Sequence, residues 1–137
     1  KRDAVMVQSE HYPVQQDYRG LSTPNALIDS NGTFHLFYDI AVDPPGSDWP
    51  DGEWRQVALA HATSTDGKHF TEVEHDIFTA GEAGTWLQWE VRSPSVIEED
   101  GQLKMWFAGT GDITKIFQPD FLFGLGYAEY GFVCDNE

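Results

Sequence analysis

The sequence predicts an all-β protein made of two four-stranded antiparallel units, which we expect to be two neighbouring blades of a partial β-propeller. Three observations favour this fold class. One segment recurs in the second half of the chain, each copy contains a tight hairpin turn, and no helical periodicity competes with the short β-prone runs. A compact sandwich, in which the two repeats face each other, is the alternative.

The repeat occupies residues 23–38 and 93–107. Each copy contains a hydroxyl residue, a proline and a small residue, followed by an apolar run, a turn and a second apolar run with aromatics. The turns are Asn-Gly at 31–32 and Asp-Gly at 100–101. Both dipeptides tolerate positive φ and are strong hairpin signals between β-prone runs.

The similarity continues in a third run, at 57–63 and again at 123–129. Its small residues suit a strand on which another layer packs closely. In the first copy an Asp-Gly turn then leads into a fourth strand, whereas no equally clear fourth strand follows in the second copy. We expect the strands of the first copy at about 26–29, 34–40, 56–63 and 69–73.

We expect one partial propeller domain over 1–137, with blade one at about 20–75 and blade two at about 90–137. Residues 4–8 alternate weakly and are a candidate for an added strand of another blade. Two blades leave an open inner face and unpaired edges, which proteins seldom tolerate. The expected partners are therefore further copies, in a homo-oligomer, or further blades from a longer chain.

Composition excludes several classes of protein. The apolar content of 40% and the aromatic content of 14% exclude a disordered chain. The formal net charge is −15, which disfavours nucleic acid and anionic membranes as partners. No apolar run approaches the roughly 20 residues that a membrane-spanning helix needs. Cys134 cannot form an internal disulfide, and the histidines lack metal-ligand spacing, so we expect neither a metal nor a cofactor.

The chain also resembles a known superfamily, the five-bladed β-propeller glycoside hydrolases, which include arabinanases, invertases, levansucrases and families 43 and 32. The resemblance runs from about Tyr12 to Tyr130 and covers about two of the five blades. The segments that carry it are Pro-Asn-Ala-Leu-Ile (24–28), Phe-His-Leu-Phe-Tyr (34–38), Ala-His-Ala-Thr-Ser-Thr-Asp-Gly-Lys-His-Phe (60–70), Ser-Pro-Ser-Val-Ile (93–97) and Lys-Met-Trp-Phe-Ala-Gly-Thr-Gly (104–111).

This resemblance implies a carbohydrate-facing function. Glycoside hydrolysis needs two carboxyl groups, one as acid and one as base or nucleophile. In the superfamily an Asp before Pro commonly supplies one of them, at the inner end of a first strand. Here Thr23-Pro24 and Ser93-Pro94 stand at the corresponding positions. A hydroxyl cannot replace a carboxylate without an activating partner, so this departure weakens the case for catalysis.

Two carboxylates remain as catalytic candidates. Asp39 ends the second strand of the first copy, and a solvated strand end is the alternative interpretation. Glu90 precedes the innermost strand of the second copy. By strand alternation it shares a face with Arg92, so a simple ion pair is its alternative.

The candidates for substrate binding lie beside the two prolines and in the segment before the second copy. Tryptophan faces can stack on sugar rings, although packing between blades explains them as well. The hydroxyl and amide side chains could instead bond to nearby backbone. Trp106, Phe107 and His61 are expected in the core. The substrate-binding candidates are Thr23, Asn25, Trp86, Trp89, Arg92 and Ser93.

Three functions remain open at this point. The chain is a glycosidase completed by other blades, a non-catalytic carbohydrate-binding propeller, or a purely structural propeller fragment.

Overall fold

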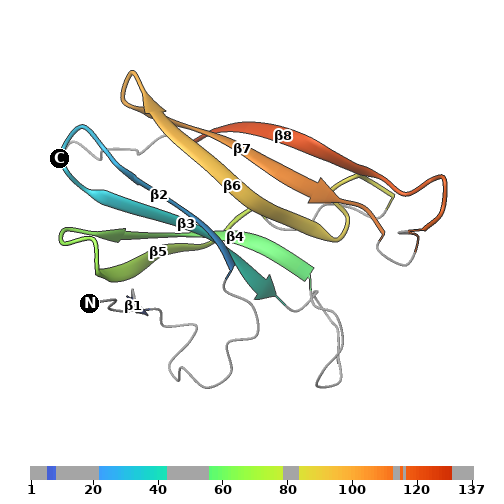
Figure 1. Ribbon diagram of the computed structural model, residues 1–137, viewed down its shortest axis with the longest axis horizontal. Helices are drawn as coiled ribbons and strands as arrows, with labels where there is room; N and C mark the ends of the chain where they lie inside the picture. The colour runs from blue at the N-terminus through green and yellow to red at the C-terminus, as the bar shows by residue number, and fades with distance from the viewer. Residues whose placement is uncertain are drawn as a thin grey trace.

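In this computed structural model the structure describes residues 6–8, 22–42, 56–78, 84–112, 115 and 117–130. No α-helix occurs in those ranges, and none of their residues form a helix that could cross a membrane. The prediction of an all-β protein is confirmed, and each strand expected in the first copy is present (Figure 1). The strands are β1 Met6–Gln8, β2 Ser22–Ile28, β3 Phe34–Val42, β4 Gln56–Ser64, β5 His69–Phe78, β6 Glu90–Glu99, β7 Gln102–Thr110 and β8 Phe123–Tyr130.

The strands form two antiparallel units, which we call blade one (β2–β5) and blade two (β6–β8). Within each unit, strands that follow one another in sequence pair with each other. β1 adds to the outer edge of blade one by pairing in parallel with β5. Among the described residues, one parallel pair, Val57 with Glu90, joins the two units, and the sheet that these residues form does not close. This open arrangement agrees with a partial propeller. A fourth strand of blade two would fall at 131–137, outside the described residues.

The hairpin turns form where the sequence predicts them. Gly32 and Gly101 have φ of 86° and 76°, values that residues with a Cβ rarely adopt. Asp29 stabilises the first turn, because its Oδ1 accepts the amides of Asn31 at 3.0 Å and Thr33 at 2.7 Å. The turns between β2 and β3, β4 and β5, and β6 and β7 lie toward one end of the molecule in Figure 1. Residues 84–89, 111–112 and 117–122 lie toward the other end.

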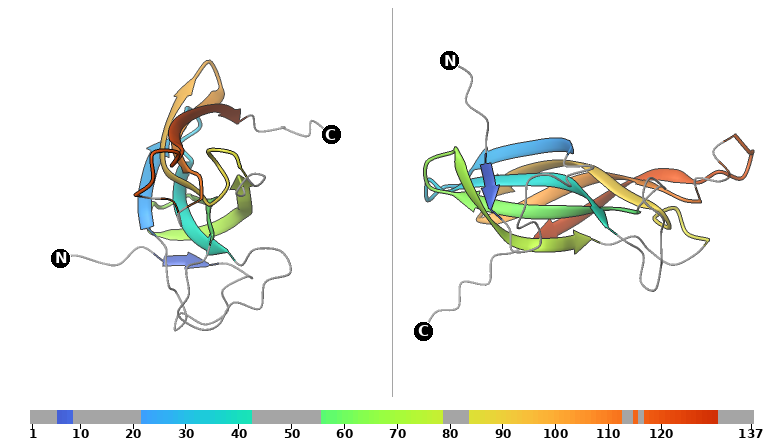
Figure 2. Two further views of the ribbon diagram at one scale, coloured as in Figure 1. Left: turned by 90° about the vertical axis from the view of Figure 1, so that its right-hand side faces the viewer. Right: turned by 90° about the horizontal axis from the view of Figure 1, so that it is seen from below.

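One face of blade two packs against one face of blade one, and a core cluster lies between them, while a second cluster is formed by β3, β4 and β5 of blade one. Alternation along each strand sends every second side chain into this shared face. Figure 2 shows the two blades from the side and from below. The buried side chains of this cluster are Phe37 and Leu59 from blade one and Val91, Val96, Leu103, Met105 and Phe107 from blade two.

Glycines in β8 allow large side chains to lie flat on the strand. A Cβ added at Gly126 would come within 2.4 Å of the Phe107 ring, and one at Gly124 within 3.2 Å of the Trp86 ring. The small residues of this run therefore leave room for aromatic rings, whereas close approach of another backbone stays a prediction.

The expectation that Trp106 and Phe107 both belong to the core is wrong for Trp106. Adjacent residues of a strand point to opposite faces, so only one of the two can face blade one. Phe107 is buried there, whereas Trp106 is exposed beside Tyr127, with the ring centroids 5.3 Å apart. The outer face of blade two carries a row of exposed apolar side chains, which we call the outer apolar row: Ile97, Trp106, Phe123, Leu125 and Tyr127.

A buried pair of histidines lies within blade one. His35 Nδ1 lies 2.9 Å from His61 Nε2, and His35 Nε2 lies 3.3 Å from Asp29 Oδ2. Because the carboxylate accepts the proton on His35 Nε2, neutral His35 offers Nδ1 as an acceptor, and His61 donates from Nε2. Burial, followed by the positive charge that His35 carries when it is protonated, lowers the pKa of His61 from 6.5 to about 3. His61 is thus a core residue, as the sequence indicates.

His61 predicts a specific loss of stability in acid. Since its pKa is lowered on folding, the unfolded state binds more protons between pH 6.5 and about pH 3. Stability should therefore fall as the pH drops through this window, by up to about 1.4 kcal/mol per pH unit from this group. In urea unfolding across this range, His61→Gln should show a shallower pH dependence than the parent. The exposed His69 is the matched control. If the free energy of unfolding depends on pH equally steeply in His61→Gln and His69→Gln, the lowered pKa of His61 is contradicted.

Candidate functional site

The two hydroxyl–proline positions adopt the same unusual backbone. Thr23 has φ of 43° and Ser93 has φ of 56°, in the left-handed region that residues with a Cβ seldom occupy. The strand register shifts at both places, between Ser22 and Asn25 in β2 and between Arg92 and Ser95 in β6. Each copy therefore has a β-bulge before its proline. Strained bulges of this kind often redirect side chains beside functional sites.

Asp39 of β3 lies between the two bulges and is fully buried. Its Oδ1 accepts the backbone amide of Ser93 at 2.9 Å, and its Oδ2 accepts the hydroxyl of Ser22 at 3.3 Å. The side chain of Thr23 also bonds to this carboxylate. One carboxylate thus joins β2, β3 and β6. The alternative interpretation of Asp39 as a solvated strand end does not hold, because these partners from distant segments allow its burial.

The surroundings of Asp39 favour its neutral, protonated form more than water does. Burial raises its pKa above the ordinary value of 3.8. The bonds from Thr23 and from the Ser93 amide oppose this shift, as does the charge of Arg92, whose Nε lies 3.8 Å from Oδ2. The rise shows that these donors only partly offset the loss of solvation.

Glu90 and Asp39 flank the same guanidinium group. Arg92 Nη1 lies 3.4 Å from Glu90 Oε2, and the same oxygen accepts the hydroxyl of Thr110 at 2.9 Å. The side chain of Glu90 is 14% exposed and that of Arg92 is 39% exposed. Arg92 is therefore the most accessible charged group of the three, and it separates the two carboxylates that were the catalytic candidates.

Asn25 lies on the other side of the bulge and contacts blade two. Its Oδ1 accepts the amide of Val96 at 3.0 Å, across the boundary between the blades. Farther along, the amide and hydroxyl of Ser30 donate to the two oxygens of Glu98 at 2.7 and 2.8 Å. Asn25 thus binds backbone in this structure, which was one of its two interpretations.

The two tryptophans lie at the start of blade two and pack against it. The ring of Trp86 stacks on Phe107 at 6.3 Å and also lies close to Gly109. Trp89 is half-buried, and its backbone amide donates to the carbonyl of Thr110 at 2.9 Å. The ring of Trp86 therefore contributes to packing, and stacking of either tryptophan on a ligand stays a prediction.

The structure thus brings together five of the eight candidates. Sequence reasoning missed Ser22 and Thr110, whose hydroxyls complete the bonding of the two carboxylates. Strand register is the feature that could have identified them. Ser22 lies opposite Asp39, and Thr110 lies opposite Glu90, in adjacent strands. The five that lie together are Thr23, Asp39, Glu90, Arg92 and Ser93.

Loss of the Asp39 carboxylate should destabilise the fold. Asp39→Ala removes the acceptor of the Ser93 amide and one of the two carboxylates beside Arg92, and we expect a loss of about 3 kcal/mol in the free energy of unfolding. Ser22→Ala removes one hydroxyl at the edge of the same group and should cost less than about 1.5 kcal/mol. Urea denaturation of the two variants measures both values.

The raised pKa of Asp39 adds a second readout. Above 3.8 and up to the raised pKa the folded state binds more protons than the unfolded state, so this group makes stability fall as the pH rises through that window. Asp39→Asn should remove this contribution. Two results count against Asp39 as the buried acceptor that joins β2, β3 and β6. One is an equal loss in the free energy of unfolding for Asp39→Ala and Ser22→Ala, and the other is an unchanged pH dependence of stability in Asp39→Asn.

Comparison with known proteins gives the family. A model described as the glycosyl hydrolases family 32 N-terminal domain matches residues 13–119. The chain is also 36% identical over 62 residues to an extracellular exo-inulinase of Aspergillus niger and to a fructan beta-fructosidase of Streptococcus mutans. Those 62 residues are 45% of this chain but only 10% and 4% of the two relatives.

The predicted resemblance is therefore confirmed, and with it a link to carbohydrate chemistry of the glycoside hydrolase kind. Because the family model extends over most of the chain and over both bulges, this chain belongs to the glycosyl hydrolase family 32 N-terminal domain family.

Proposed function

We propose that this chain binds a fructose-containing saccharide at the site formed by Thr23, Arg92 and Ser93, and that these positions do not perform hydrolysis. The observation that carries the proposal is the pair of equivalent bulges, which keep a strained left-handed backbone but carry hydroxyls. Strain of this kind costs about 1–3 kcal/mol at each residue and persists where the surroundings hold it.

The exposed groups of this site suit sugar hydroxyls. The Thr23 hydroxyl donates to Asp39, so its lone pairs can accept from a ligand. Arg92 has five N–H donors in a fixed plane, and its contacts with Asp39 and Glu90 orient that plane. Ser93 is exposed at the second bulge and adds a hydroxyl that can donate or accept.

The two carboxylates serve this site better as supports than as catalysts. Asp39 has no exposed surface and holds the Ser93 amide, so an attack on a sugar would break the contacts that allow its burial. Glu90 is held by Thr110 and Arg92. A hydrolytic pair needs one carboxyl group on each side of the scissile bond, whereas here Arg92 lies between the two.

The class of ligand comes from the relatives. Their names describe an exo-inulinase and a fructan beta-fructosidase, so fructose-containing oligosaccharides are the first probes. We propose the saccharide class and not a linkage.

Calorimetric titration with inulin-type fructo-oligosaccharides, together with an assay of released fructose, tests this function. The parent chain should bind and release no fructose. Ser93→Ala keeps the backbone amide that Asp39 needs but removes the hydroxyl, and should weaken binding about two- to tenfold. Ser95, exposed two residues farther along β6, is the matched control, and Ser95→Ala should leave affinity unchanged.

Two results contradict the proposal. One is a parent chain that binds no fructo-oligosaccharide. The other is release of fructose that Glu90→Gln abolishes, since this makes Glu90 a catalytic group and the chain a hydrolase.

We also propose that the partners of this chain include a second copy, which covers the outer apolar row of blade two. The row is contiguous, because Trp106 lies opposite Tyr127 in the neighbouring strand. Leu125 precedes Tyr127 by two residues on β8 and so lies on the same face. Leu125 is 84% exposed, and exposed apolar patches of this kind usually mark contact surfaces.

Light scattering should therefore show the 15.4 kDa chain as an oligomer, and Leu125→Glu should shift it toward a monomer. Val73 is exposed on β5 of blade one, and Val73→Glu is the control that should leave the mass unchanged. A monomeric parent at the same concentration rules out a second copy on this face.

A further inference from the structure

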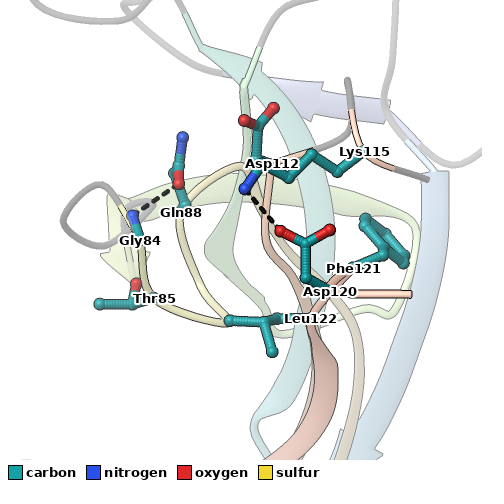
Figure 3. A pocket seen from close by; sticks show the side chains of 8 residues that line it. All are labelled: Gly84, Thr85, Gln88, Asp112, Lys115, Asp120, Phe121 and Leu122. Atoms are coloured by element: carbon teal, nitrogen blue, oxygen red, sulfur yellow. Dashed lines mark hydrogen bonds and ion pairs between the residues drawn. The ribbon is translucent and has the colours of Figure 1, made fainter. Parts of the chain in front are cut away.

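The two ends of the molecule differ in how open they are. One end carries a pocket of about 560 Å³ between the loops before β6 and after β7, and Gln88, Asp120 and Phe121 are among the residues that line it (Figure 3). The other end carries the hairpin turns (Figure 1). A Cβ added at Gly32 or at Gly101 would meet no atom within 4 Å, so the tips of these two turns face open space.

The turn between β2 and β3 carries a motif for covalent modification. Asn31, Gly32 and Thr33 read Asn-x-Thr, in which x is not proline. Enzymes of the secretory pathway attach oligosaccharides to the asparagine of this motif, and the bulky, hydrophilic product has to lie on the surface. Asn25, the other asparagine in the described part of the chain, has Leu27 two positions later and does not form the motif.

The side chains that the motif requires are available. Asn31 is exposed and Thr33 is half-buried. Among the described residues, no hydrogen bond uses the side-chain amide of Asn31 or the hydroxyl of Thr33. The amide of Asn25, by contrast, is engaged with the backbone of Val96 in the other blade. A sugar on Asn31 Nδ2 would therefore displace no contact of the fold.

The turn keeps its shape without help from the Asn31 side chain. The Gly32 amide donates to the Asp29 carbonyl at 3.0 Å, and the Asp29 amide donates to the Thr33 carbonyl at 3.0 Å. The carboxylate of Asp29 accepts the backbone amides of Asn31 and Thr33. Aspartate at the first position and glycine at the fourth also suit a tight turn. Because these contacts use only the backbone of residues 31–33, they can persist when residue 31 carries a large group.

We propose that Asn31 is an acceptor site for an N-linked oligosaccharide. The donor is a lipid-linked oligosaccharide pyrophosphate, and an oligosaccharyltransferase catalyses the transfer. Asn31 Nδ2 forms a bond to the anomeric carbon of the first sugar and gives up one proton. The bond from that carbon to the pyrophosphate oxygen breaks, and the lipid pyrophosphate leaves with the electron pair, so the step needs no oxidant or reductant.

The modified turn lies far from the site at the bulges. Asp39 follows Phe34 by five residues along β3, and at about 3.3 Å per residue these steps cover about 16 Å. A glycan on Asn31 therefore leaves the surface around Thr23 and Ser93 accessible. The inference goes beyond the proposed saccharide binding and does not rest on it, so either can fail alone.

Secretion of the full chain from a eukaryotic host, behind a cleavable secretion signal, tests the site by intact-mass spectrometry. The parent should carry the mass of one glycan, and a peptide-N-glycosidase should remove it. Asn31→Gln should lose the added mass completely. Thr33→Ala should lose it as well, whereas Thr33→Ser keeps the hydroxyl of the motif and should retain it.

The turn between β6 and β7 supplies a matched control. Its tip is equally open, but it carries Asp100 before Gly101, and Gln102 follows. Asp100→Asn combined with Gln102→Thr completes the same motif there, and this double variant should carry two glycans. A parent without added mass overturns the proposal, and so does an added mass that persists in Asn31→Gln.

A second measurement separates this inference from the proposed function. The parent before and after removal of the glycan should bind fructo-oligosaccharides with the same affinity in calorimetric titration. A glycosylated parent that binds no saccharide contradicts the proposed function and supports the acceptor site. An unmodified parent that binds saccharide does the reverse.

Discussion

Contact between the blades depends on an apolar face and on polar contacts that blade one makes at three positions along β6. Ser30 reaches Glu98 at one end, Asn25 reaches Val96 in the middle, and Asp39 reaches the amide of Ser93 at the other end. Only the last of these uses a fully buried charge, and a buried carboxylate without partners would cost several kcal/mol. Asp39 is therefore the least replaceable of these contacts. It fixes the start of β6 against β2, and with it the positions of both bulges.

This constraint has a chemical consequence. A carboxylate that satisfies backbone and hydroxyl donors in the interior is a poor nucleophile, because its lone pairs are engaged and solvent does not reach it. Meanwhile the residues that project from the bulges, Thr23 and Ser93, are hydroxyls, and Arg92 lies between the remaining carboxylates. The two bulges thus share one backbone conformation at places where the side-chain chemistry differs from the Asp-Pro that the resemblance leads us to expect. Recognition of a saccharide can survive this change more easily than bond cleavage, since hydroxyls serve as donors and acceptors but do not supply the paired carboxyl groups.

Much of the fold was predictable because its signals are local. The turn at Asn31-Gly32 requires residues that tolerate positive φ, and the alternation of the neighbouring strands identifies their faces. The burial of Asp39 was not predictable, since its main partner, Ser93, lies 54 positions away in another blade. Trp106 shows a different failure. Its residue type suggested the core, while strand alternation, which was also readable from the sequence, places it on the opposite face from Phe107.

Some features of the candidate site were likewise predictable from the sequence, and others were not. The repeat identified both proline positions, because an internal match needs no knowledge of tertiary contacts. Their shared left-handed backbone left no trace in residue type, since Thr and Ser are not residues that favour it. The pocket beside Phe121 could not be found from the sequence, because two loops separated by a whole hairpin form its walls. Pairing between β6 and β7 brings those loops together, and periodicity alone does not specify it.

The most direct measurement of the central contact is a pH titration of the Ser93 amide by NMR. If Asp39 accepts this amide in the interior, the amide proton shift should change with a midpoint above 3.8, the ordinary pKa of an aspartate, and the proton should exchange slowly with solvent. The titration should disappear in Asp39→Asn. A Ser93 amide that exchanges as fast as an exposed loop, or whose shift ignores the protonation of Asp39, would contradict the contact that positions both bulges.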